Sequence, residues 1–213
     1  MKLNKGFFLT FEGGEGSGKS TQAKILYNTL LENNFDVVLT REPGGSPLAE
    51  LIRDILVKNN NINIEPVSEM FLFAAARFDH LNKIINPALK KNKIVICDRY
   101  IDSTIAYQGY AGNVSMEIIE KINSICIGSS YPNLTFIFDI DPMVGLKRSF
   151  RENNNETRFE ERNNNFHNKI RDAFLEIGNH NSRCSIIDAS RDINVISKEI
   201  YKIFIDKLNI SNH

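Results

Sequence analysis

The sequence predicts an α/β fold in which helices flank a five-stranded parallel sheet. Two observations carry this prediction: five short runs of β-branched, aromatic and other apolar residues recur along the chain, and longer stretches with helical periodicity separate them. Each run is almost entirely apolar, as expected of parallel strands that helices cover on both faces. Ligands of such doubly wound sheets bind at the carboxyl ends of the strands, so functional residues are expected there.

The individual elements follow from the local sequence. We predict strands at 6–11, 36–40, 93–98, 134–139 and 184–188. The first run, GFFLTF, is read as a strand rather than a signal peptide because it leads directly into glycines without a small-residue cleavage site. We predict helices at 18–33, 46–57, 66–91, 114–127, 142–151, 159–178 and 192–207. In the first helix Ile25, Leu26 and Leu30 follow the period of an amphipathic helix.

No linker or repeat divides the 213 residues, which predicts a single domain over 1–213. The asparagine-rich stretch 151–165 is either a mobile surface loop or a lid over a site, and we place the lid at about 150–162. The apolar helix at 66–76 and the stretch 114–127 pack either against a partner subunit or against the core.

Composition narrows the function classes. Lysine plus arginine (26) balances aspartate plus glutamate (26), which does not favour binding to nucleic acid or to an anionic membrane. The chain has no apolar run near the roughly 20 residues of a membrane span. Cys97, Cys126 and Cys184 form no CxxC pair, which favours a reducing, cytoplasmic location over a disulfide framework or a cysteine metal site.

A glycine-rich loop follows the first predicted strand and precedes the first predicted helix. Gly13, Gly18, Lys19 and Ser20 match the phosphate-binding P-loop pattern, and in this context backbone N–H groups and a helix N-terminus surround an anion. Lys19 would reach the β- and γ-phosphates of ATP and Ser20 would ligate Mg²⁺. The alternative is a glycine-rich turn with a surface lysine. The predicted ATP-binding residues are Gly13, Gly14, Glu15, Gly16, Ser17, Gly18, Lys19, Ser20 and Thr21.

Asp98 ends the strand predicted at 93–98, where it suits a second magnesium ligand, either directly or through water. The alternative role is that of a turn former or helix cap. Cys97 beside it is expected to be a small buried hydrophobe rather than a nucleophile.

Arginines gather near the predicted strand ends, where guanidinium groups suit two phosphates better than one. They are Arg41, Arg53, Arg77 and Arg99, followed by Arg148, Arg151, Arg158 and Arg162. The sequence lacks the NKxD and DxxG motifs of GTPase switches and is short for a motor or helicase. These features favour a phosphotransferase.

Four segments then resemble bacterial thymidylate kinase in order and spacing: FEGGEGSGKST, TREPGGSPLAELIR, FLFAAAR and CDRYIDSTIAYQGY. The similarity continues through YPNLTFIFDIDPMVGLKR to the lid. The resemblance implies a P-loop kinase fold, transfer of a phosphoryl group from ATP to dTMP giving dTDP and ADP, Mg²⁺ as cofactor, and a homodimer.

The same resemblance implies roles for individual residues. The implied catalytic residues are Lys19, Asp98, Arg99, Arg151 and Arg158, and the implied metal ligands are Ser20 and Asp98. The implied substrate-binding residues are Glu15, Arg41, Glu42, Pro43, Arg53, Phe73, Arg77, Arg99, Ser103, Thr104, Tyr107 and Gln108. Phe73 would stack on thymine, Thr104 and Gln108 would read the base edge, and Tyr107 would pack against the deoxyribose.

The spacing supports these roles independently of the resemblance. Phe73 and Arg77 are four residues apart, as are Thr104 and Gln108, so on a helix each pair shares a face and can act on one ligand. Taken alone, Phe73 would be a core residue. For Ser103, Thr104 and Gln108 the alternative is a helix cap with polar surface positions.

Two further features concern the loop and the lid. Some family members, including the human type, carry an arginine at the position of Gly16; the glycine here resembles the subgroup in which the lid supplies that arginine. Arg151 and Arg158 are the lid candidates, and Arg148 is an alternative on a helix face. The resemblance directs Glu15 toward the deoxyribose 3′-hydroxyl, whereas Glu12 is expected to make a structural hydrogen bond.

The four histidines, His80, His167, His180 and His213, lie outside these motifs and are expected to be structural or solvated. The chemistry needs no base, because the second pKa of a phosphate monoester is about 6 and the acceptor is mostly dianionic at neutral pH. Two other functions remain open: another nucleoside monophosphate kinase acting on AMP, CMP or GMP, and a non-catalytic nucleotide-binding module on the same fold.

Overall fold

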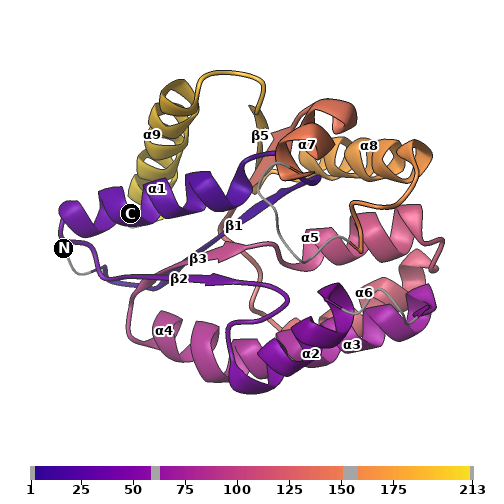
Figure 1. Cartoon of the computed structure of the whole chain (residues 1–213). Helices are drawn as coiled ribbons and strands as arrows, with labels where there is room; N and C mark the ends of the chain where they lie inside the picture. The colour runs from indigo at the N-terminus through magenta and orange to yellow at the C-terminus, as the bar shows by residue number, and fades with distance from the viewer. Residues whose placement is uncertain (1–2, 59–62, 151–157, 212–213) are drawn as a thin grey trace.

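The structure, a computed structural model, describes residues 3–58, 63–150 and 158–211 (Figure 1). Its sheet has five parallel strands in the order β2-β3-β1-β4-β5. The strands are β1 (Phe7–Gly13), β2 (Val37–Arg41), β3 (Ile94–Asp98), β4 (Leu134–Asp139) and β5 (Cys184–Asp188). All five predicted strands and the predicted fold class are confirmed, and β1 runs two residues further than expected, up to the glycine loop.

Alternate residues of β1 enter two separate cores. Phe7, Leu9 and Phe11 pack with α1 (Lys19–Glu32) and α9 (Ile193–Ser211) on one face of the sheet, and the ring of Phe7 meets the edge of Phe204. Phe8 enters the core on the other face. This alternation is the period-2 geometry of a strand covered on both sides, and it explains why the run is continuously apolar.

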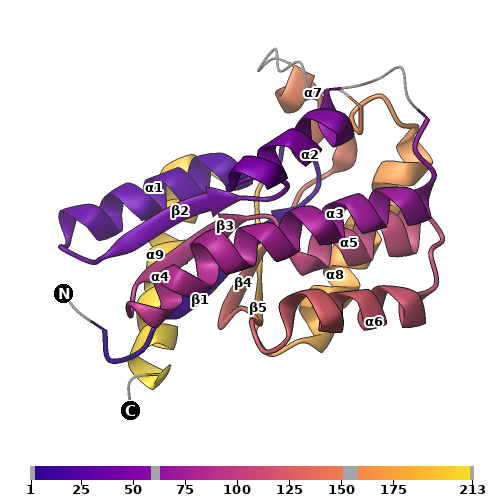
Figure 2. The same cartoon turned by 90° about the horizontal axis from the view of Figure 1, so that it is seen from below.

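The second face carries more helices. They are α4 (Asn86–Lys90), α5 (Ile101–Thr104), the π-helical η2 (Ile105–Ala111), α6 (Met116–Ile127) and α8 (Asn164–His180). Two remaining elements, α2 (Pro47–Val57) and α3 (Pro66–His80), pack against each other and on the outside of this layer (Figure 2). The short α7 (Pro142–Ser149) follows β4. None of the described helices combines the length and apolar character needed to cross a bilayer.

Three helix predictions need correction. The stretch 66–91 is not one α-helix, because the π-helical η1 (Leu81–Ile85) interrupts it between α3 and α4. Pro87 has no N–H to bond a carbonyl of the preceding turn, which accounts for a change of hydrogen-bond register there. The helix predicted from 159 begins only at Asn164, because the Asn163 side chain caps it by accepting from the N–H of Phe166 (2.9 Å).

The third correction concerns 101–111, which forms α5 and η2 although no helix was predicted there. Its β-branched, aromatic and glycine residues have low intrinsic helix propensity, so packing rather than propensity stabilises it. In addition, α9 continues to Ser211, beyond the predicted end at 207. Part of the predicted lid, 151–157 with Arg151, lies outside the described residues.

Candidate active site

A cavity of about 640 Å³ lies at the carboxyl ends of β1, β2 and β3. It continues from the glycine loop, past the turn after β3, to α3 and η2. Most of the predicted site residues line it: Glu15, Gly16, Ser17, Gly18, Lys19, Ser20, Thr21, Arg41, Glu42, Pro43, Arg53, Phe73, Arg77, Asp98, Arg99, Ser103, Thr104, Tyr107 and Gln108. We call the part at the glycine loop the donor end and the part at α3 and η2 the acceptor end.

The donor end is built from one tight segment. β1 stops at Gly13 and α1 starts at Lys19, and Gly18 adopts a left-handed backbone (φ 88°) between them. The ammonium group of Lys19 donates to the carbonyl of Gly14 (2.6 Å) and to the hydroxyl of Ser17 (3.1 Å). Burial, together with the nearby charge of Arg99, lowers the pKa of Lys19 to about 8.

Gly16 is required by close packing against α7. Its φ is 59°, and a Cβ added there would lie 1.9 Å from the carbonyl oxygen of Gly145. That contact is far inside van der Waals distance, so any side chain at this position would displace α7. An arginine cannot occupy this place in the loop without such a shift.

Ser20 and Asp98 meet at the end of β3, where the Ser20 hydroxyl donates to the Asp98 carboxylate. Ser20 belongs to the first turn of α1 and Asp98 is the last residue of β3, so the contact joins two neighbouring elements. A hydroxyl and a carboxylate are oxygen ligands of the kind Mg²⁺ takes when phosphates and water complete its shell. The residues present therefore fit a magnesium ion.

Arg99 joins the two ends of the cavity. Its φ is 67°, and its guanidinium group donates to the carbonyl of Gly13 (3.0 Å), to the hydroxyl of Ser103 (3.1 Å) and to both oxygens of Glu15 (3.1 Å each). Tyr107 also donates to Glu15 (2.6 Å). Burial alone would raise the pKa of Glu15, but Arg99 and Lys19 outweigh it and lower that pKa to about 2. Glu15 is thus a carboxylate that accepts from Arg99 and from Tyr107 of η2.

Glu12 makes structural hydrogen bonds, as expected. It is fully buried and accepts from the N–H of Tyr100 (2.7 Å) and from the hydroxyl of Ser103 (2.6 Å). Ser103 lies inside α5 and does not cap it. Through Glu12, the end of β1 fixes the first turn of the helix that carries the acceptor residues.

The acceptor end is a buried polar network. Arg77 is 2% exposed and donates to Glu42 (2.7 Å), to the carbonyl of Tyr100 (3.1 Å) and to Thr104 (3.0 Å). Thr104 and Gln108 are also buried, so the alternative of polar surface positions is wrong for both. Burial opposes the charge of Arg77, yet Glu42 raises the pKa of the guanidinium above its ordinary value.

Side chains from distant segments complete this end. Gln108 donates to Glu69 (2.7 Å), and Glu69 also forms a buried ion pair with Arg158 (2.5 Å). Phe159 places its ring 5.5 Å from that of Tyr107 and 6.5 Å from that of Phe73. The described end of the predicted lid, residues 158–162, therefore contributes an aromatic wall beside the predicted base platform.

The predicted arginines of the lid region occupy different places. Arg158 also donates to the carbonyl of Leu56 (2.8 Å), and it is held at the acceptor end. Arg148 lines the cavity and donates to the carbonyl of Ala189 (3.1 Å). Arg151 lies outside the described residues. Gly13 and Gly14 shape the loop without being among the described residues that line the cavity.

The sequence interpretation missed Glu69 and Phe159. A signal existed for Glu69, because Glu69, Phe73 and Arg77 are spaced by four residues and share one face of α3. Phe159 had no such signal, since only the tertiary fold brings it to Tyr107.

Together, the parallel sheet, the phosphate loop with Lys19, the Ser20–Asp98 pair and a second polar pocket beyond Arg99 define a P-loop phosphotransferase with an acceptor site. The family model described as thymidylate kinase matches residues 11–200. The chain therefore belongs to the thymidylate kinase family, as the motif resemblance predicted.

Individual relatives agree with this assignment. A thymidylate kinase of Wolbachia sp. subsp. Brugia malayi is 48% identical over 198 residues, which cover 91% of this chain and 93% of that protein. A thymidylate kinase of Afipia carboxidovorans is 44% identical over 201 residues, which cover 93% of this chain and 88% of that protein. The crystal structure of thymidylate kinase from Ehrlichia chaffeensis superposes with a TM-score of 0.75 at 39% identity, covering 94% of this chain and 99% of that one.

Proposed function

We propose that this chain catalyses the magnesium-dependent transfer of the γ-phosphoryl group of ATP to dTMP, giving dTDP and ADP in the synthesis of dTTP. The observation that carries the proposal is the single cavity of about 640 Å³ that joins the glycine loop to the α3–η2 pocket. Phosphoryl transfer requires the two anionic substrates to meet with their reacting groups in line. A continuous cavity with the guanidinium group of Arg99 between its two ends meets that requirement.

At the donor end, backbone N–H groups of the loop and the ammonium group of Lys19 bind the ATP phosphates. Ser20 and Asp98 would hold Mg²⁺, which offsets negative charge on the phosphates when bound. Two acceptors explain how Lys19 can be buried: its ammonium group donates to the carbonyl of Gly14 and to the hydroxyl of Ser17.

At the acceptor end, Arg77 contacts dTMP and Arg99 contacts phosphate near the point of transfer. Arg53, which donates to the carbonyl of Pro43 (2.6 Å), assists at the phosphate end of dTMP, and the chain around Arg41 shapes the cleft. Phe73 is the platform for the thymine ring, Thr104 and Gln108 contact its edge, and Glu15 accepts from the 3′-hydroxyl. No histidine is among the described residues that line the cavity. This agrees with an acceptor that is already mostly dianionic at neutral pH and needs no general base.

The lid supplies the arginine that stabilises the transferring group, with Arg151 and Arg158 as candidates and Arg148 as the helix-face alternative. The packing of Gly16 against Gly145 supports this division, because the loop has no room for an arginine of its own. For Arg158 the role requires its ion pair with Glu69 to open, since both side chains are buried.

A substrate panel tests the proposal. Purified protein with Mg-ATP is offered dTMP, dUMP, AMP, CMP and GMP in a coupled assay for ADP. We expect the highest kcat/KM for dTMP, and a lower value for dUMP, since one methyl group is worth about 1–3 kcal/mol. Faster turnover of AMP, CMP or GMP would support the alternative monophosphate kinase, and no turnover of any acceptor would support a non-catalytic module.

We also propose a cytoplasmic homodimer. The helices α2 and α6 each pack against α3, and the three helices expose large apolar side chains, among them Leu51, Phe71, Phe78 and Ile125. Exposed apolar side chains concentrated on adjacent helices favour a protein partner over solvent. All three cysteines are free thiols, which supports a reducing compartment. Sedimentation equilibrium tests the dimer.

A further inference from the structure

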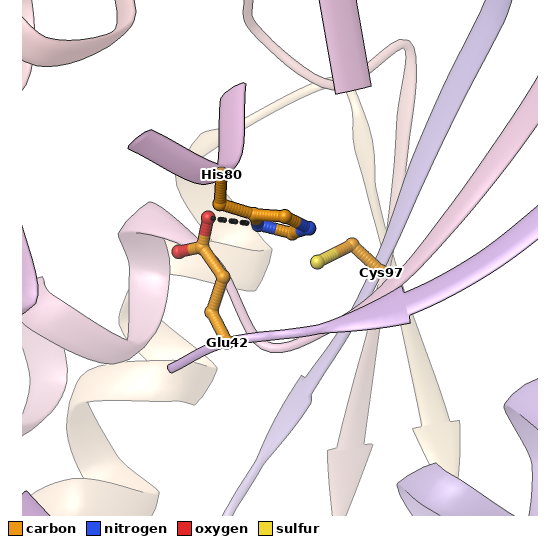
Figure 3. Close-up of side chains that lie close together, drawn as sticks. All are labelled: Glu42, His80 and Cys97. Carbon is orange, nitrogen blue, oxygen red and sulfur yellow. Dashed lines mark hydrogen bonds and ion pairs between the residues drawn. The ribbon is translucent and has the colours of Figure 1, made fainter. Parts of the chain in front are cut away.

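Three side chains of types that can bind a metal ion, Glu42, His80 and Cys97, lie close together beneath the acceptor end (Figure 3). Glu42 follows β2, His80 is the last residue of α3, and Cys97 is in β3. Their ligand atoms lie within 4.8 Å of one another, and all three residues are buried. None of the proposed catalytic steps uses His80, so its place in this cluster calls for an explanation.

His80 is hydrogen-bonded at both ring nitrogens. Nδ1 lies 3.1 Å from one oxygen of Glu42, and Nε2 lies 2.6 Å from the hydroxyl of Thr40. A carboxylate accepts but does not donate, so Nδ1 carries the proton and donates to Glu42. In the neutral ring Nε2 then accepts from Thr40. The other oxygen of Glu42 accepts from Nε of Arg77 at 2.7 Å.

The same residue types can hold a metal ion, but the contacts argue against one here. Both nitrogens of His80 and both oxygens of Glu42 already have protein partners at hydrogen-bond distance. The thiol of Cys97 donates to the carbonyl of Arg99 (3.1 Å), and burial, with Glu42 nearby, raises its pKa well above the ordinary value. A metal would have to break this network and would need the thiolate, which is disfavoured there.

The ring of His80 also packs closely against the loop after β2. A Cβ added to Gly45, whose φ is 85°, would lie 2.3 Å from Nε2 of His80, so the loop backbone packs directly on the ring. The ring therefore contacts the loop at three places: Thr40 before it, Glu42 within it and Gly45 at its end. This loop carries residues of the proposed acceptor end, including Pro43.

We propose that His80 is a positioning residue for dTMP binding, acting through the chain Thr40–His80–Glu42–Arg77. His80 orients the Glu42 carboxylate. Glu42 in turn holds the guanidinium group of Arg77 in the orientation in which it donates to Thr104. The inference rests on the proposed contact of Arg77 with dTMP. It adds a residue that contacts neither substrate.

Isosteric variants test the proposal. The amide nitrogen of His80→Asn can replace Nδ1 and keep the bond to Glu42, whereas that of His80→Gln replaces Nε2 and loses it. We expect His80→Ala and His80→Gln to raise the KM for dTMP about tenfold, and His80→Asn to change it less than threefold. The KM for ATP should stay within twofold in all three variants. Ile85→Val is the matched control, because it removes a methylene from the same buried layer without touching the network.

Melting temperatures of all four variants separate positioning from general destabilisation. If the KM for dTMP follows the melting temperature in every variant, including Ile85→Val, the proposal is wrong. A Glu42→Gln, His80→Ala double variant should show less than the sum of the two single effects, since both act on Arg77. Full additivity would also overturn the proposal.

Two further measurements separate the inference from its premise. If Arg77→Ala raises the KM for dTMP and His80→Ala does not, only the inference fails. If Arg77→Ala leaves that KM unchanged, the proposed acceptor assignment itself fails. Zinc that copurifies in stoichiometric amount with the wild type and is absent from His80→Ala would show that the cluster is a metal site and would overturn the hydrogen-bond chain.

Discussion

The donor and acceptor ends of the cavity are assembled in different ways. Lys19 and Ser20 of the donor end both lie in the first turn of α1, directly after the glycine loop, and the Ser20 hydroxyl donates to Asp98 at the end of β3. The acceptor end draws on the loop after β2, on α3, on η2 and on the described end of the predicted lid, residues 158–162. Arg158 bonds there to the carbonyl of Leu56, 102 residues away in the chain.

The difference lies in what holds each end in place. At the donor end the backbone itself presents the binding groups, so the shape follows from local glycine geometry. At the acceptor end charged side chains are held by one another, as in the pairs Glu42–Arg77 and Glu69–Arg158. Breaking a buried pair costs about 3–5 kcal/mol, so substitutions at the acceptor end should affect stability as well as binding.

The largest effect is expected at the donor end. Lys19→Ala should lower kcat by a factor on the order of 10³ or more, because the loop loses the cation that stabilises the transferring phosphoryl group. The KM for dTMP and the melting temperature should change little, since both hydrogen bonds of the Lys19 ammonium group to described residues lie within its own loop. Steady-state kinetics measure kcat and the KM for dTMP, and calorimetry measures dTMP affinity. A large loss of dTMP affinity would show that the two ends are not separable in this way.

The lid arginines come next. At least one of Arg151→Ala and Arg158→Ala should lower kcat by a factor on the order of 10² with the KM for dTMP little changed. Arg158→Ala should also destabilise the fold by about 3 kcal/mol, because it leaves Glu69 buried without its cation. Steady-state kinetics and urea unfolding measure the two effects. If Arg151→Ala and Arg158→Ala both kept a near wild-type kcat, the proposed role of the lid arginines in phosphoryl transfer would be wrong.

Glu15 tests whether the loop serves both ends. Glu15→Gln should raise the KM for dTMP about 30-fold, because it removes a charge-assisted hydrogen bond worth about 2 kcal/mol. The KM for ATP should stay unchanged. The carboxylate is the common acceptor of Arg99, which joins the two ends, and of Tyr107 on the acceptor side. An effect confined to the KM for ATP would assign Glu15 to the phosphates instead.

The sequence predicts the donor end better than the acceptor end for a physical reason. Five apolar runs and a contiguous glycine pattern depend on residues close together in the chain, and the strands, the loop and Asp98 follow from them. Glu12 as a structural acceptor was also predictable, because it directly precedes the loop.

The remaining features depend on long-range packing. The helix at 101–111 forms against α8 despite poor local propensity, and the partner of Arg158 is Glu69, nearly ninety residues away. The dual hydrogen bonding of His80 likewise arises only when β2 and the end of α3 lie side by side. No local pattern in the sequence contains such pairings.

The smallest expected effect is a pH dependence that is confined to the donor end. With a pKa of about 8, Lys19 loses its charge as the pH rises through 8, whereas an ordinary lysine keeps it to about 10.5. The value of kcat/KM for ATP reports the free enzyme, so it should fall about tenfold between pH 8 and pH 9.2. The value for Lys19→Arg, whose guanidinium group stays charged, should be lower overall but flat over this range. A flat wild-type profile up to pH 10 would mean that Lys19 keeps the pKa of an ordinary lysine and is better solvated than its burial implies. The donor end would then resemble the solvent-exposed surface more than the acceptor end does.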